Sequence, residues 1–249
     1  MTTTIILGDG GLGRAVQTAL LAREGATVRD EVLLLGRPRT GRHHDPRDLA
    51  GVDLLVEASR ADAVFGNLAS GLEAGARRVI IATTGWQADR PRVESLLAEY
   101  GAAAVAASNF SLGVVLFGRL VEAAVTLFGP LEAFDPFLLE WHRRAKRDRP
   151  SGTAIDLRQR IVTGHPRLAN ADDLEVVSVR AGSSPGMHLV GFDAAGETVE
   201  LRLTARDRSA YAAGILAAAD WLAHTPREPG LHAFDPIVDE LVARDPVAV

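Results

Sequence analysis

The chain has 249 residues, a formal net charge of −5 and no cysteine. Its length allows one large domain or two modest ones. The lack of cysteine excludes disulfides, a thiolate nucleophile and cysteine-based metal sites. The mild acidity argues against general nucleic-acid binding, and no apolar run reaches the roughly 18–20 residues of a membrane span. The first residues lack the basic and long apolar regions of a signal peptide, so we expect a cytoplasmic protein.

The first 108 residues alternate between short apolar runs and segments with helical periodicity. Runs rich in Val, Ile and Leu predict buried strands at residues 3–8, 31–36, 52–59, 78–85 and 102–108. Between them, helices are predicted over about 11–25, 61–75 and 90–100. Strands that alternate with helices are typical of a parallel sheet built from βαβ units.

The pattern changes after residue 109. The sequence predicts a long apolar helix over 112–128, a strand over 134–142, a helix over about 151–163, and three strands over 174–182, 187–196 and 197–207. We expect these strands to form an antiparallel sheet packed with helices. A last apolar helix, over 210–223, is predicted to return to the first domain. The fold class is therefore α/β: a Rossmann-like parallel sheet domain over 1–108 and 209–249, with an inserted α+β domain over 109–208.

A glycine-rich motif follows the first predicted strand. Gly8-Asp9-Gly10-Gly11-Leu12-Gly13 matches G-x-G-x-x-G and opens the first predicted helix. Such glycines allow a tight turn and let backbone N–H groups approach a pyrophosphate at the helix N-terminus. The alternative is a plain glycine-rich turn, but the position between strand and helix favours a dinucleotide site.

The end of the second predicted strand carries no carboxylate. A carboxylate there would accept a hydrogen bond from the adenosine ribose. Arg37 and Arg39 follow Gly36 instead, and arginines suit the 2′-phosphate of NADP. We therefore predict NADPH as the cofactor, with NADH as the alternative; the arginines could also be solvated loop charges.

The stretch "EWHRRAKRDRPSGTAID", residues 140–156, gathers cations just before a predicted helix start. Ser151 and Thr153 can add hydroxyl donors to that helix N-terminus, and Gly152 lets a ligand approach the backbone. This combination predicts a site for a small, highly anionic substrate such as a carboxylate. His142 and Lys146 are candidate proton donors. The alternative is a capped helix beside a solvated basic loop.

One further cluster, His43-His44-Asp45, lies on a polar loop that contains proline. No third ligand is spaced suitably for a metal. We therefore expect these histidines to be solvated and predict no metal site.

The pattern E-x-H-x-x-x-K-x-D-x-P-S-G-T-A, from Glu140 to Ala154, resembles the signature of the 4-hydroxy-tetrahydrodipicolinate (dihydrodipicolinate) reductase family. The resemblance covers nearly the whole chain, because further motifs follow in the family's order. These are "GDGGLGR" (8–14), "ATTGW" (82–86), "ASNFSLGV" (107–114), "SVRAG" (178–182), "GMH" (186–188) and "ARDRSAYAAG" (205–214).

The resemblance implies an NAD(P)H-dependent oxidoreductase of lysine and diaminopimelate biosynthesis. Hydride from the nicotinamide would reduce the cyclic imine 4-hydroxy-tetrahydrodipicolinate to tetrahydrodipicolinate. It also implies that the inserted domain binds the dicarboxylate substrate and assembles the chains into a homotetramer.

The resemblance also assigns residues to roles. His142 and Lys146 match the family's catalytic pair. The substrate residues it implies are Ser151, Gly152, Thr153, Thr84 and Arg208, with Arg143 where the family has a second histidine. The cofactor residues are Gly8, Gly10, Gly11, Leu12, Gly13, Arg37, Thr83, Thr84, Gly85, Asn109 and Phe110.

Some positions depart from the family pattern. Arg143 replaces the second histidine, Arg149 replaces a small residue, and Leu12 replaces a basic residue common in the glycine loop. Glu57-Ala58-Ser59 stands where Asp-Phe-Thr or Asp-Phe-Ser is usual. Two alternatives therefore remain: a divergent member that reduces another anionic cyclic imine, and a nucleotide-binding regulatory protein without turnover.

Overall fold

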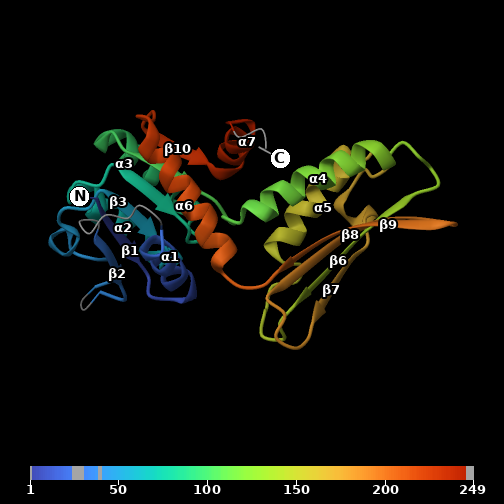
Figure 1. Cartoon of the computed structure of the whole chain (residues 1–249), viewed down its shortest axis with the longest axis horizontal. Helices are drawn as coiled ribbons and strands as arrows, with labels where there is room; N and C mark the ends of the chain where they lie inside the picture. Colours follow the sequence, from blue (N-terminus) through green and yellow to red (C-terminus); the bar gives the residue numbers. More distant parts are fainter. Residues whose placement is uncertain (1, 24–30, 39–40, 245–249) are drawn as a thin grey trace. The chain divides into compact units, whose positions relative to one another are not determined.

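The computed structural model describes residues 2–23, 31–38 and 41–244, which form two compact units (Figure 1). The first unit is built from Met1–Leu112 and Arg208–Val249, and the second from Gly113–Asp207. The second unit is thus inserted into the sequence of the first.

A parallel sheet forms the centre of the first unit. Its strands lie in the order β10-β5-β4-β3-β1-β2, and every neighbouring pair is parallel. The strands are β1 (Thr3–Leu7), β2 (Glu31–Leu35), β3 (Leu54–Glu57), β4 (Arg78–Ile81), β5 (Ala103–Ala106) and β10 (Gly230–Ala233). The strand order reverses at β1, whose neighbours are β2 on one side and β3 on the other. In open parallel sheets such a reversal is where ligands bind, outside the carboxyl ends of the strands.

Helices pack around this sheet. They are α1 (Gly11–Leu21), α2 (Val64–Glu73), α3 (Arg90–Tyr100), α6 (Ser209–His224) and α7 (Phe234–Arg244), with short 3₁₀ turns at Pro46–Leu49, Ala61–Ala63 and Gln87–Asp89. Helix α1 packs on α6, and α2 packs on α3. Right-handed crossovers on either side of the reversal put these pairs on opposite faces. No helix in the described ranges is long and apolar enough to cross a membrane.

The strands of the first unit are apolar along their length because both faces are covered. Ile5, Ile6 and Leu7 are all fully buried although successive side chains point to opposite faces. On one face, Leu68 and Leu72 of α2 complete the core.

The second unit has a four-stranded sheet in the order β7-β6-β8-β9. Its elements are α4 (Leu112–Phe128), β6 (Asp135–His142), α5 (Gly152–Gly164), a 3₁₀ turn at Ala171–Asp173, β7 (Val176–Arg180), β8 (Gly186–Ala194) and β9 (Glu197–Ala205). Val121 of α4 and Leu157 of α5 pack with Leu138 and Val190 of the sheet, so both helices cover one of its faces.

The α/β class, with a Rossmann-like sheet and an inserted α+β unit, is confirmed. The expectation that the second sheet is antiparallel was wrong in part, because β6 and β7 pair in parallel. The chain returns from β6 to β7 through α5, and such a crossover brings the next strand back in the same direction. Strand β10 and helix α7 were not predicted. His44, expected in solvent, is only 6% exposed.

Candidate active site

The glycine loop lies at the carboxyl end of β1. Gly8 has φ +111°, and a Cβ on it would lie 2.3 Å from the Ala58 carbonyl oxygen; one on Gly13 would lie 1.9 Å from the Gly8 oxygen. These two positions therefore admit only glycine. Gly8 N also donates to Leu35 O at 2.8 Å, which ties the loop to the end of β2.

The N-terminus of α1 is open. Gly10 caps it without a side-chain hydrogen bond, no acidic residue lies in the first turn, and no heavy atom lies within 4 Å of a Cβ built on Gly10. The positive end of the helix dipole is therefore accessible to an anion. Gly11 is exposed and Leu12 half-buried in this first turn. The loop thus fits the pyrophosphate of a dinucleotide.

Arg208, predicted to bind substrate, lies against this loop. A Cβ on Gly11 would lie 3.4 Å from both Cδ and Nε of the Arg208 side chain. The guanidinium therefore adds positive charge beside the N-terminus of α1. Its role in substrate binding stays a prediction. Arg37 is exposed directly after Gly36, and Arg39 lies outside the described residues.

A buried carboxyl group holds the ends of β3 and β4 together. Glu57 is 0% exposed and accepts hydrogen bonds from Ser59 N and Asn67 Nδ2, both at 2.8 Å, and from Thr83 Oγ1 at 3.1 Å. Burial raises the pKa of Glu57, although these hydrogen bonds oppose the effect. The Thr83 side chain is thus engaged by the protein. Thr84 and Gly85 follow it and are exposed.

Asn109 and Phe110 connect β5 to α4. Phe110 is 2% exposed, and its ring lies 4.9 Å from that of Phe234. Its carbonyl oxygen would lie 1.6 Å from a Cβ on Gly214, so only glycine fits there. Asn109 Oδ1 accepts from Ser111 N at 2.9 Å. These contacts anchor the segment, and its predicted contact with cofactor stays a prediction.

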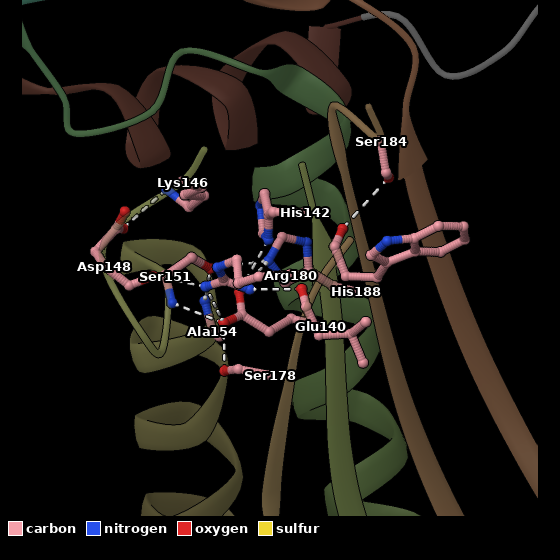
Figure 2. Close-up of polar contacts among 12 residues, drawn as sticks. Glu140, His142, Lys146, Asp148, Ser151, Ala154, Ser178, Arg180, Ser184 and His188 are labelled. Carbon is pink, nitrogen blue, oxygen red and sulfur yellow. Dashed lines mark hydrogen bonds and ion pairs between the residues drawn. The ribbon is translucent and has the colours of Figure 1, made fainter. Parts of the chain in front are cut away.

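In the second unit, a fully buried carboxylate is the centre of a polar cluster (Figure 2). Glu140 Oε1 accepts from Ser151 N at 3.0 Å, Ser178 Oγ at 2.5 Å and Arg180 Nη2 at 2.7 Å. Burial alone would raise the pKa of Glu140, but these donors outweigh it and lower the pKa to about 2. Glu140 is therefore ionised at neutral pH.

The second oxygen of Glu140 faces two histidines. Oε2 lies 3.2 Å from His142 Nδ1 and 3.8 Å from His188 Nε2, and the two rings meet edge to face at 5.2 Å. In the described part of the chain, neither Glu140 Oε2 nor His142 Nδ1 has a hydrogen-bond partner, so the two atoms are close without being hydrogen-bonded. Burial lowers the pKa of His142, and burial together with His142 lowers that of His188 to about 4. Both rings are mostly neutral at neutral pH.

Glu140, His142 and His188 are also residue types that bind zinc, and their ligand atoms lie within 4.8 Å of one another. Two contacts argue against a metal here. Arg180 forms a buried ion pair with Glu140, and His188 Nε2 already lies 3.2 Å from Ser151 Oγ. The cluster is therefore best described as a hydrogen-bonded network.

This network holds the N-terminus of α5. Ser151 is 3% exposed and caps the helix, accepting from Ala154 N at 3.2 Å. Its N–H and its hydroxyl thus serve the fold. Gly152 is exposed, with no heavy atom within 4 Å of a Cβ built on it, and Thr153 is half-buried. With no acid in the first turn, this helix end can receive an anion.

Lys146 is the least exposed of the cations in residues 143–149. Its side chain is 24% exposed, and Nζ lies 2.8 Å from Asp148 Oδ2 (Figure 2). Arg143 and Arg147 are exposed. Lys146 is the only lysine among the 27 lysine and arginine residues of the chain. Since an arginine side chain stays protonated, Lys146 is the one basic side chain here that can give up a proton.

The structure thus brings His142, Ser151, Gly152, Thr153 and Lys146 into one region of the second unit. The glycine loop, Thr84 and Arg208 lie in the first unit. Sequence reasoning did not assign Ser178 and Arg180 to the site. The sequence signal that could have found them is the alternation of the strand "SVR", which puts Ser178 and Arg180 on one face. In the sheet, Ser178 pairs with Glu140 and Arg180 with His142.

A parallel sheet with an open glycine loop at its switch point, joined to an α+β unit with a second anion site, is the architecture of two-domain, dinucleotide-dependent reductases. Comparison with known proteins narrows this class. The family model for the C-terminus of dihydrodipicolinate reductase matches residues 113–237.

Among similar proteins is the 4-hydroxy-tetrahydrodipicolinate reductase of Archaeoglobus fulgidus, 32% identical over 75% of this chain and 76% of the relative. That of Christiangramia forsetii is 29% identical over 87% of this chain and 90% of the relative. A dipicolinate-bound dihydrodipicolinate reductase from Paenisporosarcina sp. TG-14 has a similar fold, with a TM-score of 0.69, 19% identity, and coverage of 94% of this chain and 97% of that one. The chain belongs to the dihydrodipicolinate reductase family.

Proposed function

We propose that the protein catalyses the NAD(P)H-dependent reduction of 4-hydroxy-tetrahydrodipicolinate to tetrahydrodipicolinate, a step of lysine and diaminopimelate biosynthesis. The observation that carries the proposal is the site in the second unit. There, the sole lysine stands beside a buried carboxylate–histidine network and an open helix N-terminus. The relatives' names and the dipicolinate-bound neighbour support a small dicarboxylate as substrate.

Each part of the site has a role in this reaction. Gly152 and Thr153, at the positive end of α5, bind one substrate carboxylate, and Arg143 binds the other in place of the family's second histidine. Thr84 and Arg208 are the proposed substrate contacts of the first unit. Residues 1–108 and 209–249 form the dinucleotide domain, and residues 109–208 form the substrate and oligomerisation domain.

The chemistry adds one hydride and one proton and releases water. A bound reduced nicotinamide supplies the hydride. The proton comes from the protein: Lys146 delivers it to the substrate atom that gains negative charge, and His142 helps to orient this donor. Glu140 keeps His142 and the N-terminus of α5 in place.

The glycine loop fits a dinucleotide, since Gly8 and Gly13 allow the tight turn and Gly10 leaves the helix end open. Gly11 and Leu12 complete the loop, while Thr83, Thr84, Gly85, Asn109 and Phe110 line the proposed nicotinamide end. Arg37 would suit the 2′-phosphate of NADPH, whereas NADH needs only an acceptor for the ribose hydroxyl, so the choice between the two depends on the groups around the end of β2. A cytoplasmic homotetramer, by family resemblance, completes the proposal.

A coupled assay tests the proposal. Dihydrodipicolinate synthase generates the substrate from pyruvate and aspartate semialdehyde, and absorbance at 340 nm reports cofactor oxidation. Enzyme-dependent loss of absorbance is expected. No loss, with cofactor binding intact, would favour a different cyclic imine, for which Arg143 is the motivating residue.

Lys146 provides the sharper test. Lys146→Arg keeps the charge but removes the transferable proton, so turnover should fall about 10²–10⁴-fold while nicotinamide binding persists. Arg147→Ala, at an exposed neighbour, is the matched control. Unchanged turnover in Lys146→Arg would refute the catalytic assignment.

A further inference from the structure

The end of β2 has no carboxylate of its own. The strand ends at Leu35 and continues into Gly36 and Arg37. In dinucleotide-binding sheets, an acid at this point accepts a hydrogen bond from the ribose 2′-hydroxyl of NAD(H), and an arginine accommodates the 2′-phosphate of NADP(H). Arg37 by itself therefore points to the phosphate.

A carboxylate reaches the same point from the glycine loop. Asp9, between Gly8 and Gly10, lies against Gly36: a Cβ on Gly36 would lie 3.0 Å from Asp9 Oδ2 and 3.5 Å from Oδ1. The hydrogen bond from Gly8 N to Leu35 O fixes the loop beside the strand end. Asp9 is exposed, so its carboxylate is accessible to a ligand. It stands where the strand end would otherwise supply an acid.

The described surroundings of Asp9 add a further carboxylate. A cavity of about 570 Å³ adjoins the strand end, a size that suits a small ligand. Its described lining includes Asp48 and Arg37, and Asp45, whose charge is paired with Arg47. His44 also lines it, and burial lowers the pKa of His44, so the ring is mostly neutral at neutral pH. Among the described residues, a 2′-phosphate here would thus meet the carboxylates of Asp9 and Asp48 as well as Arg37.

We propose that Asp9 accepts the hydrogen bond of the adenosine ribose 2′-hydroxyl and selects NADH over NADPH. A carboxylate accepts from a hydroxyl with a strong, charge-assisted bond, whereas it repels a phosphate at the same place. The inference rests on the proposed function in one respect, namely that the first unit binds a nicotinamide dinucleotide. It replaces the expectation of NADPH drawn from Arg37.

Binding measurements on the full chain test this assignment without turnover. NADH and NADPH are titrated separately, with nicotinamide fluorescence as the readout, into wild type, Asp9→Asn and Asp9→Ala. Asn keeps an acceptor and removes the charge, so Asp9→Asn should tighten NADPH binding relative to NADH by about tenfold or more. Asp9→Ala removes the acceptor too and should weaken NADH by about tenfold.

Glu73→Gln is the matched control, because Glu73 is an exposed acid at the last residue of α2. It removes the same charge and should leave the ratio of the two dissociation constants unchanged. A wild type that prefers NADPH, or an Asp9→Asn variant with the wild-type ratio and melting temperature, would overturn the inference. A wild type that binds neither dinucleotide would instead overturn the proposed function.

Discussion

Replacing Glu140 with glutamine should destabilise the second unit strongly. Glutamine keeps the shape but removes the charge that pairs with Arg180, whose side chain is 1% exposed. It also places an amide NH₂, which is a donor, where a carboxylate oxygen either accepted hydrogen bonds or faced the two histidines. The arginine charge would then be buried without its partner, the costly outcome for a buried ion pair.

Two independent estimates of the cost agree. Removing one partner of a buried pair typically costs about 3–5 kcal/mol. The pKa of Glu140 falls from its ordinary 4.5 to about 2, which at about 1.36 kcal/mol per pH unit gives about 3 kcal/mol. We therefore expect Glu140→Gln to lower the free energy of unfolding by about 3 kcal/mol at pH 7.

The pH dependence distinguishes this cause from a packing defect. Because the pKa of Glu140 is lower in the folded state, its contribution is complete above about pH 4.5 and is lost as the pH falls through about 2. The stability difference between wild type and Glu140→Gln should thus be constant above pH 4.5 and shrink below it.

Urea unfolding followed by tryptophan fluorescence measures this difference, since Trp141 neighbours the network and donates to Ala181 O. Ser178→Ala is the matched control, because it removes one neutral donor to Glu140 and should cost only about 1 kcal/mol. A loss below 1 kcal/mol in Glu140→Gln at pH 7, or a difference that grows on acidification, would refute the reasoning.

Two further predictions concern buried groups. The pKa of His188 falls from 6.5 to about 4 in the folded state, so wild-type stability should decline as the pH falls from about 6.5 to 4, and urea midpoints of His188→Gln should decline less over that window. Equal declines would contradict burial of a neutral His188. Gly13→Ala should lower the melting temperature and abolish dinucleotide binding, because its Cβ would lie 1.9 Å from Gly8 O. The control is Gly10→Ala, which has open space around it and should have the wild-type melting temperature. Equal melting temperatures of the two variants would contradict the prediction and show that the loop can relax.

The sequence predicted most elements of the fold because their periodicity is local. The helix expected over 112–128 is α4, where a mainly apolar segment is followed by Gly-Pro. Strand β10 escaped prediction because four half-exposed or exposed residues, Gly230–Ala233, carry no alternation. Its place at the sheet edge depends on pairing with β5. The parallel pairing of β6 with β7 was likewise invisible, since a pattern gives the period of a strand and not its partner.

The same difference between local and long-range features applies to the site. Residues of the basic stretch 140–156 could be picked out because charge, glycine and a helix start lie close in sequence. Arg180 is 40 residues from Glu140, and Asp9 is 27 from Gly36, so only the folded chain brings each pair together. His44 is buried and its backbone N–H donates to Asn67 Oδ1 at 3.0 Å, a contact that a polar loop sequence does not reveal.

The ionisable side chains of the second unit differ in protonation state and therefore in their proposed roles. Glu140 is charged but pairs with Arg180, and burial keeps His142 and His188 mostly neutral at neutral pH. Neither histidine is then a ready store of a proton, and the arginines of the basic stretch do not release theirs. Lys146 remains; it is partly exposed and held by Asp148. In the proposed reaction the network therefore holds the helix end and His142 in position, and the one lysine donates the proton. For this reason Lys146→Arg should lose turnover although it preserves every charge.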